Sequence, residues 1–209
     1  MELKLAVAAV ALSSAACSGG GMGLVARYPY VEDQGLALAH ETLSIDVERD
    51  GSVNVSALFR FVARGAPRDR VMTFPVAGPR GAAQGFAAEL VGREALPLPV
   101  APSEPGHLPV GDAAQTWDLW VGGAELARHD GWLRVRYTQR GNGDFAYTLK
   151  SGAYWSGPIE RLEVLVTDPH GRIASLSVEG RRVDVAGRAR VAVELTELEP
   201  VHGVRLELK

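Results

Sequence analysis

The chain has 209 residues, of which 46% are hydrophobic and 22% are charged. This balance is typical of one folded domain or two small ones, and it excludes intrinsic disorder over most of the length. The formal net charge is −3. A partner with a phosphate backbone needs a basic face, so this charge argues against a nucleic-acid partner.

The first sixteen residues have the pattern of an export signal. Lys4 precedes an apolar run over residues 5–12, and the small residues 13–16 lead to Cys17. An apolar core of this length followed by small residues is typical of a secretory signal and is too short to cross a bilayer. We therefore expect residues 1–16 to be a signal peptide that is removed on export.

Cys17 is the only cysteine of the chain. A free thiol is a liability in an oxidising compartment, and a thioether to diacylglycerol would remove it. Residues 12–17 resemble the lipobox of bacterial lipoproteins, with Ser14 where a leucine is most common. The resemblance implies lipidation of Cys17. Plain secretion after cleavage at Ala16 and an uncleaved cytoplasmic chain are the alternatives.

Lipidation predicts a place in the cell envelope, with the chain held at a membrane through its lipid anchor. Residues 17–38 then form the lipidated tether and an extended segment, and residues 39–209 form the folded region. In the lipoproteins that the signal resembles, an aspartate after the cysteine often marks retention in the inner membrane. Ser18 occupies that position here, which favours the outer membrane or a periplasm-facing location.

The folded region begins with the clearest β-pattern in the chain. Apolar and polar residues alternate over residues 42–47 and again over residues 52–63, and Asp50-Gly51 between them is a hairpin turn signal. The acidic side chains Glu41, Asp46 and Glu48 are expected on the solvated face of the first strand.

The rest of the folded region also favours short strands. Prolines crowd residues 97–114, which argues against a helix there and marks the expected boundary if the chain has two subdomains. Turn residues separate strands expected at 70–74, 86–91, 115–121, 131–139, 144–149, 160–166, 173–178, 182–185, 189–195 and 204–208, with one helical turn at 123–128. The pattern predicts an all-β fold, an antiparallel β-sandwich, with two small β subdomains as the alternative.

Three blocks of sequence carry a family resemblance. They are the strand led by Glu41, the Met-Thr-Phe-Pro of residues 72–75, and the Tyr-x-Leu-Lys-Ser-Gly-x-x-Trp-x-Gly-x-Ile of residues 147–159. In this order they resemble an uncharacterised family of exported bacterial proteins described as a domain of unknown function. The resemblance covers residues 38–166, departs at the prolines of residues 97–109, and implies an extracytoplasmic β-sandwich without an assigned activity.

Aromatic residues are the candidate ligand contacts. Tyr154 and Trp155 follow a glycine-centred turn, where Trp155 is expected to cover the open end of its own core; stacking of the two rings on a glycan is the alternative that makes them candidate contacts. Trp117 and Trp120 are three residues apart on one expected strand, so they are predicted to point to opposite faces. Trp120 is therefore the third candidate contact, and Trp132 is assigned to the core.

No motif predicts catalysis, a cofactor or a metal site. The five histidines are scattered singly, without a second histidine or cysteine at metal-ligand spacing. No Gly-x-Ser-x-Gly elbow marks a nucleophile, although a Ser-His-Asp triad can be assembled from distant residues. We expect a non-enzymatic envelope lipoprotein that binds a protein or glycan partner. A hydrolase of cell-wall or surface polysaccharide and a structural assembly subunit are the alternatives.

Overall fold

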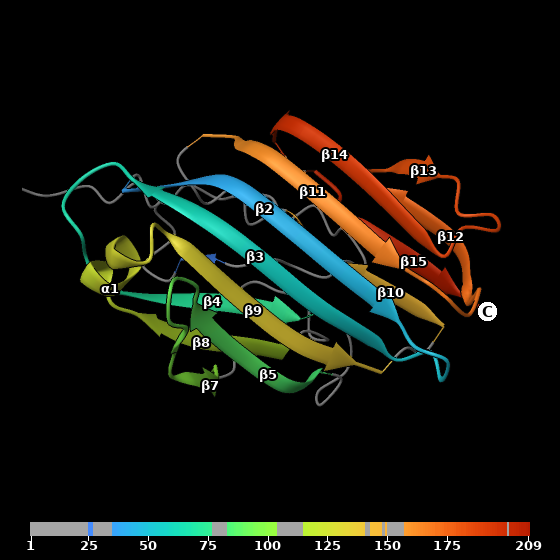
Figure 1. Ribbon diagram of the computed structural model, residues 1–209, viewed down its shortest axis with the longest axis horizontal. Helices are drawn as coiled ribbons and strands as arrows, with labels where there is room; N and C mark the ends of the chain where they lie inside the picture. Colours follow the sequence, from blue (N-terminus) through green and yellow to red (C-terminus); the bar gives the residue numbers. More distant parts are fainter. Residues whose placement is uncertain are drawn as a thin grey trace, which may run out of the picture.

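The fold is known from a computed structural model of the whole chain. It describes residues 25–26, 35–76, 83–103, 115–140, 143–147, 149, 157–199 and 201–209. Seven strands form one large sheet that crosses the view of Figure 1 diagonally. Their spatial order is β14 (Arg190–Leu198), β11 (Ile159–Thr167), β2 (Leu36–Val47), β3 (Val53–Ala63), β9 (Trp132–Gln139), β5 (Ala83–Leu90) and β6 (Leu96–Pro97).

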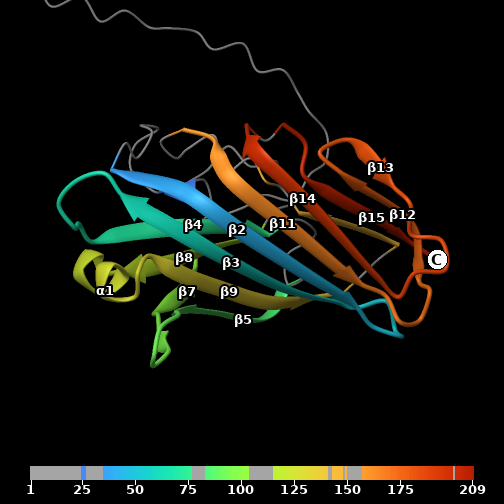
Figure 2. The same ribbon diagram turned by 45° about the horizontal axis from the view of Figure 1, so that its top comes forward.

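Two four-stranded sheets cover the inner face of the large sheet (Figures 1 and 2). The β4–β8 sheet has the order β1 (Val25–Ala26), β4 (Arg70–Val76), β8 (Gln115–Val121) and β7 (Val100–Pro102). The β12–β15 sheet has the order β10 (Asp144–Tyr147), β15 (Val204–Leu208), β12 (Ile173–Val178) and β13 (Arg181–Val183). The short helix α1 (Gly123–Arg128) joins β8 to β9.

The β2–β3 hairpin shows why the sequence forms these strands. Every second residue of β3 from Val53 to Phe61 is apolar and buried, so one face of the strand packs inward. At the turn, the backbone N–H and the hydroxyl of Ser52 both donate to Asp50 Oδ1, at 2.9 and 2.6 Å. Gly51 has a φ of +81°, a conformation that glycine adopts without steric cost.

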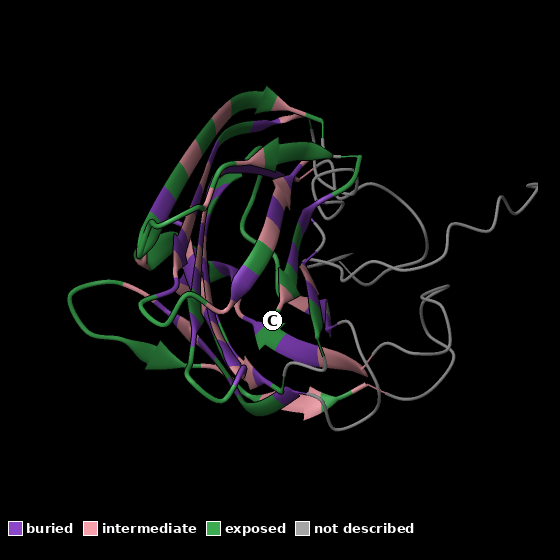
Figure 3. Cartoon of the chain, turned by 90° about the vertical axis from the view of Figure 1, so that its right-hand side faces the viewer, coloured by how far each residue is buried: buried purple, intermediate pink, exposed green. Residues whose placement is uncertain are grey.

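An aromatic cluster in the core joins the three sheets. The ring of Phe74, on β4, is fully buried. Its centroid lies 6.5 Å from that of Phe59 on β3, 5.9 Å from Tyr137 on β9 and 6.2 Å from Tyr147 on β10. Figure 3 shows the layers from the side, with buried residues concentrated between them. One side chain therefore contacts residues of all three sheets.

The structure confirms the predicted all-β, sandwich-like fold. The predicted strands at 115–121, 173–178 and 204–208 and the helical turn at 123–128 have the bounds of β8, β12, β15 and α1. One feature differs from an antiparallel sandwich: β2 pairs with β11 in parallel, while its other neighbour β3 is antiparallel.

No helix within the described ranges has the length and apolar character needed to cross a membrane.

Candidate functional site

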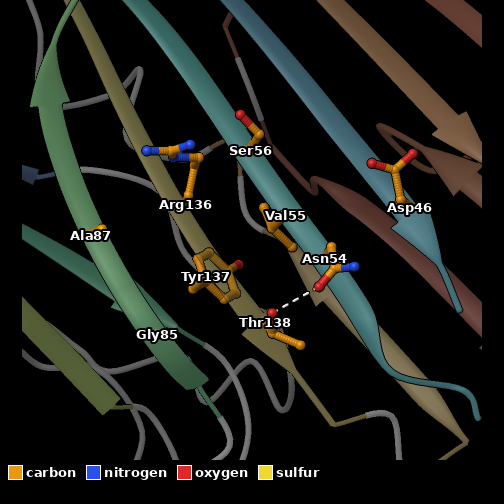
Figure 4. Close-up of a pocket in the computed structure, with 9 residues that line it drawn as sticks. All are labelled: Asp46, Asn54, Val55, Ser56, Gly85, Ala87, Arg136, Tyr137 and Thr138. Carbon is orange, nitrogen blue, oxygen red and sulfur yellow. Dashed lines mark hydrogen bonds between the residues drawn. The ribbon is translucent and has the colours of Figure 1, made fainter. Parts of the chain in front are cut away.

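The candidate site is a shallow groove of about 410 Å³ on the outer face of the large sheet. It crosses four strands, β2, β3, β9 and β5, and Figure 4 shows the side chains that line it. The polar members are Asp46, Asn54, Ser56, Arg136 and Thr138. We call this surface the sheet groove.

Strand register places these polar groups in two neighbouring rows. Asp46 is paired with Asn54, and Asn54 is paired in turn with Thr138, so these three residues form one row across β2, β3 and β9. Ser56 is paired with Arg136 in the next row. Because side chains alternate between the faces of a strand, residues 54 and 56, like 136 and 138, point to the same outer side.

Strand β5 borders the groove on one side. Its pairing with β9 shifts register between Gln84 and Ala87, which marks a β-bulge. Gly85 lies within this bulge at a φ of +61°, and a Cβ built on it would meet no atom within 4 Å. Gly85 and Ala87 therefore leave the groove open on the side of β5.

The polar groups of the groove are only partly satisfied. Thr138 donates to Asn54 Oδ1 at 2.7 Å, and Asn54 Nδ2 donates to Glu48 Oε1 at 2.9 Å. Arg136 lies 3.4 Å from a carboxylate oxygen of Glu89, and its side chain remains 55% exposed. The side chains of Asp46 and Ser56 bond to no residue in the described part of the chain. The groove thus offers free donors and acceptors to a ligand.

A second group of side chains lies further along the same face. The Arg60 guanidinium lies 5.7 Å from the centre of the Trp132 ring, and the His40 ring lies 5.9 Å from it. His40 Nε2 also lies 3.9 Å from Glu163 Oε2. We call these four residues the Trp132 cluster. The assignment of Trp132 to the core is wrong, because Leu133 and Val135 take the inward positions of β9.

The structure places only one of the aromatic candidates. Trp120 is 44% exposed and lies between the buried Leu119 and Val121, so it points away from the large sheet. Trp117 faces inward and stacks on Phe86 with ring centroids 4.7 Å apart, as the spacing of the two tryptophans predicted. Trp120 therefore lies on a different surface from the sheet groove.

The remaining site predictions lie outside the described residues. They are Tyr154 and Trp155, predicted as ligand contacts, and Cys17, predicted as the lipidation site. The structure neither brings Tyr154 and Trp155 to Trp120 nor separates them from it, so all three assignments stay predictions.

The predicted position of Glu41 on the solvated face of its strand is wrong. Asp46 and Glu48 are exposed as expected, but Glu41 is fully buried on the inner face of β2. The Tyr147 hydroxyl, on the facing sheet, donates to Glu41 Oε1 at 3.0 Å. Burial raises the pKa of Glu41 to about 8, and the hydrogen bond from Tyr147 offsets part of that rise.

The sequence contains part of the signal for the sheet groove. The polar phase of β3 and β9 marks Asn54, Ser56, Arg136 and Thr138 as outward residues. Nothing in the sequence shows that β9 lies beside β3, because 68 residues separate Ala63 from Trp132 in the chain (132 − 63 − 1). The groove therefore exists only through the pairing of strands that lie far apart in the sequence.

The described lining residues can hydrogen-bond a ligand in several ways. Their outward side chains supply two hydroxyls, one amide, one guanidinium and one carboxylate, the last from Asp46, while the Tyr137 ring is buried. Among all described residues, no three histidine, aspartate or glutamate side chains are grouped so that they could hold a metal ion.

Comparison with known proteins gives weak structural similarities. No family model matches the sequence, and no curated protein is significantly similar to it, so the resemblance to the exported bacterial family stays a prediction. Leukotriene A4 hydrolase from Saccharomyces cerevisiae is 7% identical, with a TM-score of 0.42, over 85% of this chain and 30% of that one. An M1 zinc metallopeptidase from Deinococcus radiodurans is 13% identical, with a TM-score of 0.42, over 86% of this chain and 44% of that one.

A two-domain M1 zinc metallopeptidase bound to L-arginine is 16% identical, with a TM-score of 0.41, and again 86% of this chain and 44% of that chain are covered. The chain therefore spans less than half the length of these three proteins. The TM-scores are low, and no function is drawn from these similarities.

Proposed function

We propose that the protein is a non-enzymatic binding protein that holds a glycan on the outer face of its large sheet. The observation that carries this proposal is the sheet groove, an open depression of about 410 Å³ whose lining combines apolar surface with unpartnered hydrogen-bonding groups. Sites for apolar small molecules are enclosed and lined mainly by apolar side chains. An open groove lined by hydroxyl, amide, guanidinium and carboxylate groups suits a ligand rich in hydroxyls.

The Trp132 cluster extends the proposed contact surface. Trp132 and Thr138 are six residues apart on β9 and point to the same face, so they lie about 20 Å apart along the strand. Arg134 and Arg136 point outward between them. An extended glycan along β9 would contact an aromatic ring at one end and the polar rows at the other, a combination that suits the apolar face and the hydroxyls of a sugar.

The proposed location supports a glycan partner. If residues 1–16 are removed and Cys17 is lipidated, the binding face lies in the cell envelope, where polysaccharide is abundant. This part of the proposal is supported by the sequence pattern of residues 1–17. The envelope location would bring the protein to its glycan ligand, and the sheet groove would contact that ligand.

Binding of defined envelope oligosaccharides to the full folded chain tests the proposal. Isothermal titration with peptidoglycan fragments and surface-polysaccharide fragments should give saturable binding, and Arg136→Ala and Trp132→Ala should each weaken it roughly tenfold. Arg128→Ala is the matched control, because Arg128 is an exposed arginine on α1, outside the groove.

Two outcomes would overturn the proposal. Binding that is unchanged in both Arg136→Ala and Trp132→Ala would remove the outer face as the site. Release of reducing ends from the oligosaccharides over time would show hydrolysis, and the non-enzymatic function would then be wrong.

A further inference from the structure

Strand β14 forms one edge of the large sheet. It is nine residues long and pairs with β11, and no second strand pairs with it in the described part of the chain. An edge strand presents unpaired backbone N–H and C=O groups, and natural proteins commonly protect such an edge with lysine, proline or a bulge. Arg190–Leu198 contains no lysine and no proline, and its one positive φ, +49° at Glu197, lies next to the carboxyl end of the strand. The backbone of β14 is therefore available for pairing.

Apolar side chains remain incompletely covered along this edge. Val193 and Leu195 of β14 pack against the core but are only partly buried, whereas their pairing partners Val164 and Leu162 on β11 are fully buried. On the facing β12–β15 sheet, Val183 is also only partly buried. The two layers of the sandwich therefore expose an apolar strip on the side of β14.

A cleft of about 570 Å³ lies at the carboxyl-terminal end of β14. Residues 194–198 line it together with Glu179, Arg181, Val201 and His202, and Val201 is 59% exposed. We call the edge of β14 and this cleft the β14 seam.

The β14 seam carries an excess of negative charge. Three carboxylates line the cleft, from Glu179, Glu194 and Glu197, together with the guanidinium of Arg181. Arg161 on β11 lies 3.2 Å from Glu194 Oε1 and also pairs with Glu163, so these four carboxylates still outnumber the two guanidiniums. The backbone N–H groups of Val201 and His202 donate to Glu179 Oε2, at 2.9 and 3.1 Å. The other oxygen, Oε1, is buried and has no hydrogen-bond donor among the described residues. A basic ligand would complement this charge.

We propose that the β14 seam docks an extended segment of a partner protein in which apolar and basic residues alternate. The segment adds a strand to β14, so that its backbone satisfies the free edge. Its apolar side chains then cover Val193 and Leu195, and its basic side chains meet the carboxylates of the cleft. Strand addition to an exposed sheet edge is a common mode of peptide recognition.

A second copy of the chain fits this edge less well. The antiparallel register that pairs all of β14 with its copy is centred on Glu194, the middle residue of the strand. It would place two Glu194 carboxylates opposite each other, and like charges at directly opposed positions destabilise a strand pair. A basic segment meets the same positions with the opposite charge.

The test uses the full chain and a capped Lys-Val-Lys-Val-Lys-Val-Lys peptide as probe. We expect saturable binding by isothermal titration, together with slower hydrogen exchange of β14 backbone amides in the complex. A Lys-Val-Lys-Pro-Lys-Val-Lys peptide has the same charge but cannot form a continuous strand, and it should bind roughly tenfold more weakly.

Matched variants locate the site. Leu195→Lys places a charge on the inner side of the edge, and Glu194→Gln removes one carboxylate, so each should weaken binding of the valine peptide. Leu96→Lys adds the same charge to exposed Leu96 on β6, at the opposite edge of the same sheet, and should leave binding unchanged. The exchange measurement needs no variant, so the test holds even if Leu195→Lys fails to fold.

Four results would overturn the proposal. The proline peptide could bind as well as the valine peptide, or the slowed amides could lie outside β14. Amides of β14 that are already protected in the free monomer would show that another segment of the chain covers the edge. A concentration-dependent dimer that Leu195→Lys abolishes would make the occupant a second copy.

Discussion

Glu41 is a buried acid between the layers of the sandwich. It has no exposed surface, it accepts one hydrogen bond from Tyr147, and its Oε2 has no partner among the described residues. Desolvation disfavours the charged carboxylate, and this effect raises its pKa from 4.5 to about 8. Glu41 is therefore protonated in the folded protein at neutral pH.

Protonation of Glu41 makes stability depend on pH in a defined direction. Between pH 4.5 and 8 the folded state holds a proton that the unfolded state releases, so the free energy of unfolding falls as pH rises through this window. The expected slope from this residue is at most about 1.4 kcal/mol per pH unit, and it disappears above the folded pKa. Glu41→Gln should remove this contribution, so the free energy of unfolding, measured in urea from pH 5 to 8.5, should fall less steeply with pH than in the wild type.

The matched control is Glu160→Gln, which makes the same chemical change at an exposed position on β11. It should leave the pH dependence as in the wild type. If Glu41→Gln keeps the wild-type slope, Glu41 does not carry the proton, and the assignment of its pKa is wrong.

Among the described residues, Tyr147 alone donates a hydrogen bond to the buried carboxyl of Glu41. Tyr147→Phe should destabilise the fold by about 1–2 kcal/mol, because Glu41 Oε1 then loses its donor. It should also raise the pKa of Glu41 further, since the Tyr147 hydrogen bond lowers it. A double-mutant cycle of Tyr147→Phe with Glu41→Gln measures the coupling, and Tyr137→Phe is the control. Additive effects of the Tyr147 and Glu41 changes would contradict the contact.

At the scale of elements, the turn between α1 and β9 depends on Gly131. This residue has a φ of +77°, and a Cβ built on it would overlap the carbonyl group of Phe61. Its own carbonyl accepts from the Phe61 N–H at 2.9 Å. The close approach of β3 to the start of β9 therefore needs glycine at this position.

Two glycine substitutions separate backbone strain from steric overlap. Gly187 also has a positive φ, of +67°, but a Cβ on it would meet no atom within 4 Å. We expect Gly187→Ala to cost about 1 kcal/mol of stability and Gly131→Ala roughly 3 kcal/mol, because the second change adds an overlap with backbone. Urea unfolding of the two variants measures the difference. Equal losses would show that Phe61 moves away at little cost.

Strand bounds could be predicted where turn residues flank the strand directly in the sequence. Strand β8 and strand β12 have clear turn residues on both sides, and their predicted bounds agree with the structure. Strand β2 begins six residues earlier than expected, at Leu36, because residues 36–39 are all buried and show no alternation. A strand that is covered on both faces gives no period-two signal.

The environment of single residues was less predictable, because it depends on distant partners. Glu41 has the polarity of a solvent-facing residue, and its partner Tyr147 is 106 residues away in the sequence. Trp132 has the size of a core residue, but it lies on the outer face beside His40 and Arg60. Alternation in the sequence shows which residues share a face of a strand. Tertiary packing decides which residues of that face are buried and which contacts they make.

At the scale of the whole molecule, the proposed envelope location depends on Cys17. Metabolic labelling with palmitate should mark the wild-type protein and should fail to mark Cys17→Ala. Fractionation should place the labelled protein with the membranes, because a lipid chain supplies the anchor. Label that persists in the mutant would contradict lipidation at this cysteine.

The large sheet offers two surfaces, the sheet groove on its outer face and the β14 seam at one edge. Arg161 pairs with Glu194 of the seam and with Glu163 of the Trp132 cluster, but among the described residues no ion pair joins the seam to Arg136. Strands β11, β2 and β3 lie between β14 and β9, the strand that carries Arg136 and Thr138. Distant sites without shared residues behave additively, so Leu195→Lys should leave glycan affinity unchanged and Arg136→Ala should leave peptide affinity unchanged. Titrations of each variant with each ligand measure this. A cross effect would show that the two surfaces are coupled.

The parallel pairing of β2 with β11 sets an order in which the chain can fold. β3 follows β2 directly and can form a hairpin at once, whereas β11 begins only at Ile159. A chain that emerges from its amino terminus, from a ribosome or through an export channel, exposes one long edge of β2 until that late segment arrives. Pairing over such a separation is slow and leaves the nascent chain open to aggregation. We therefore expect aggregation to be favoured most during this interval, before β11 closes the sheet.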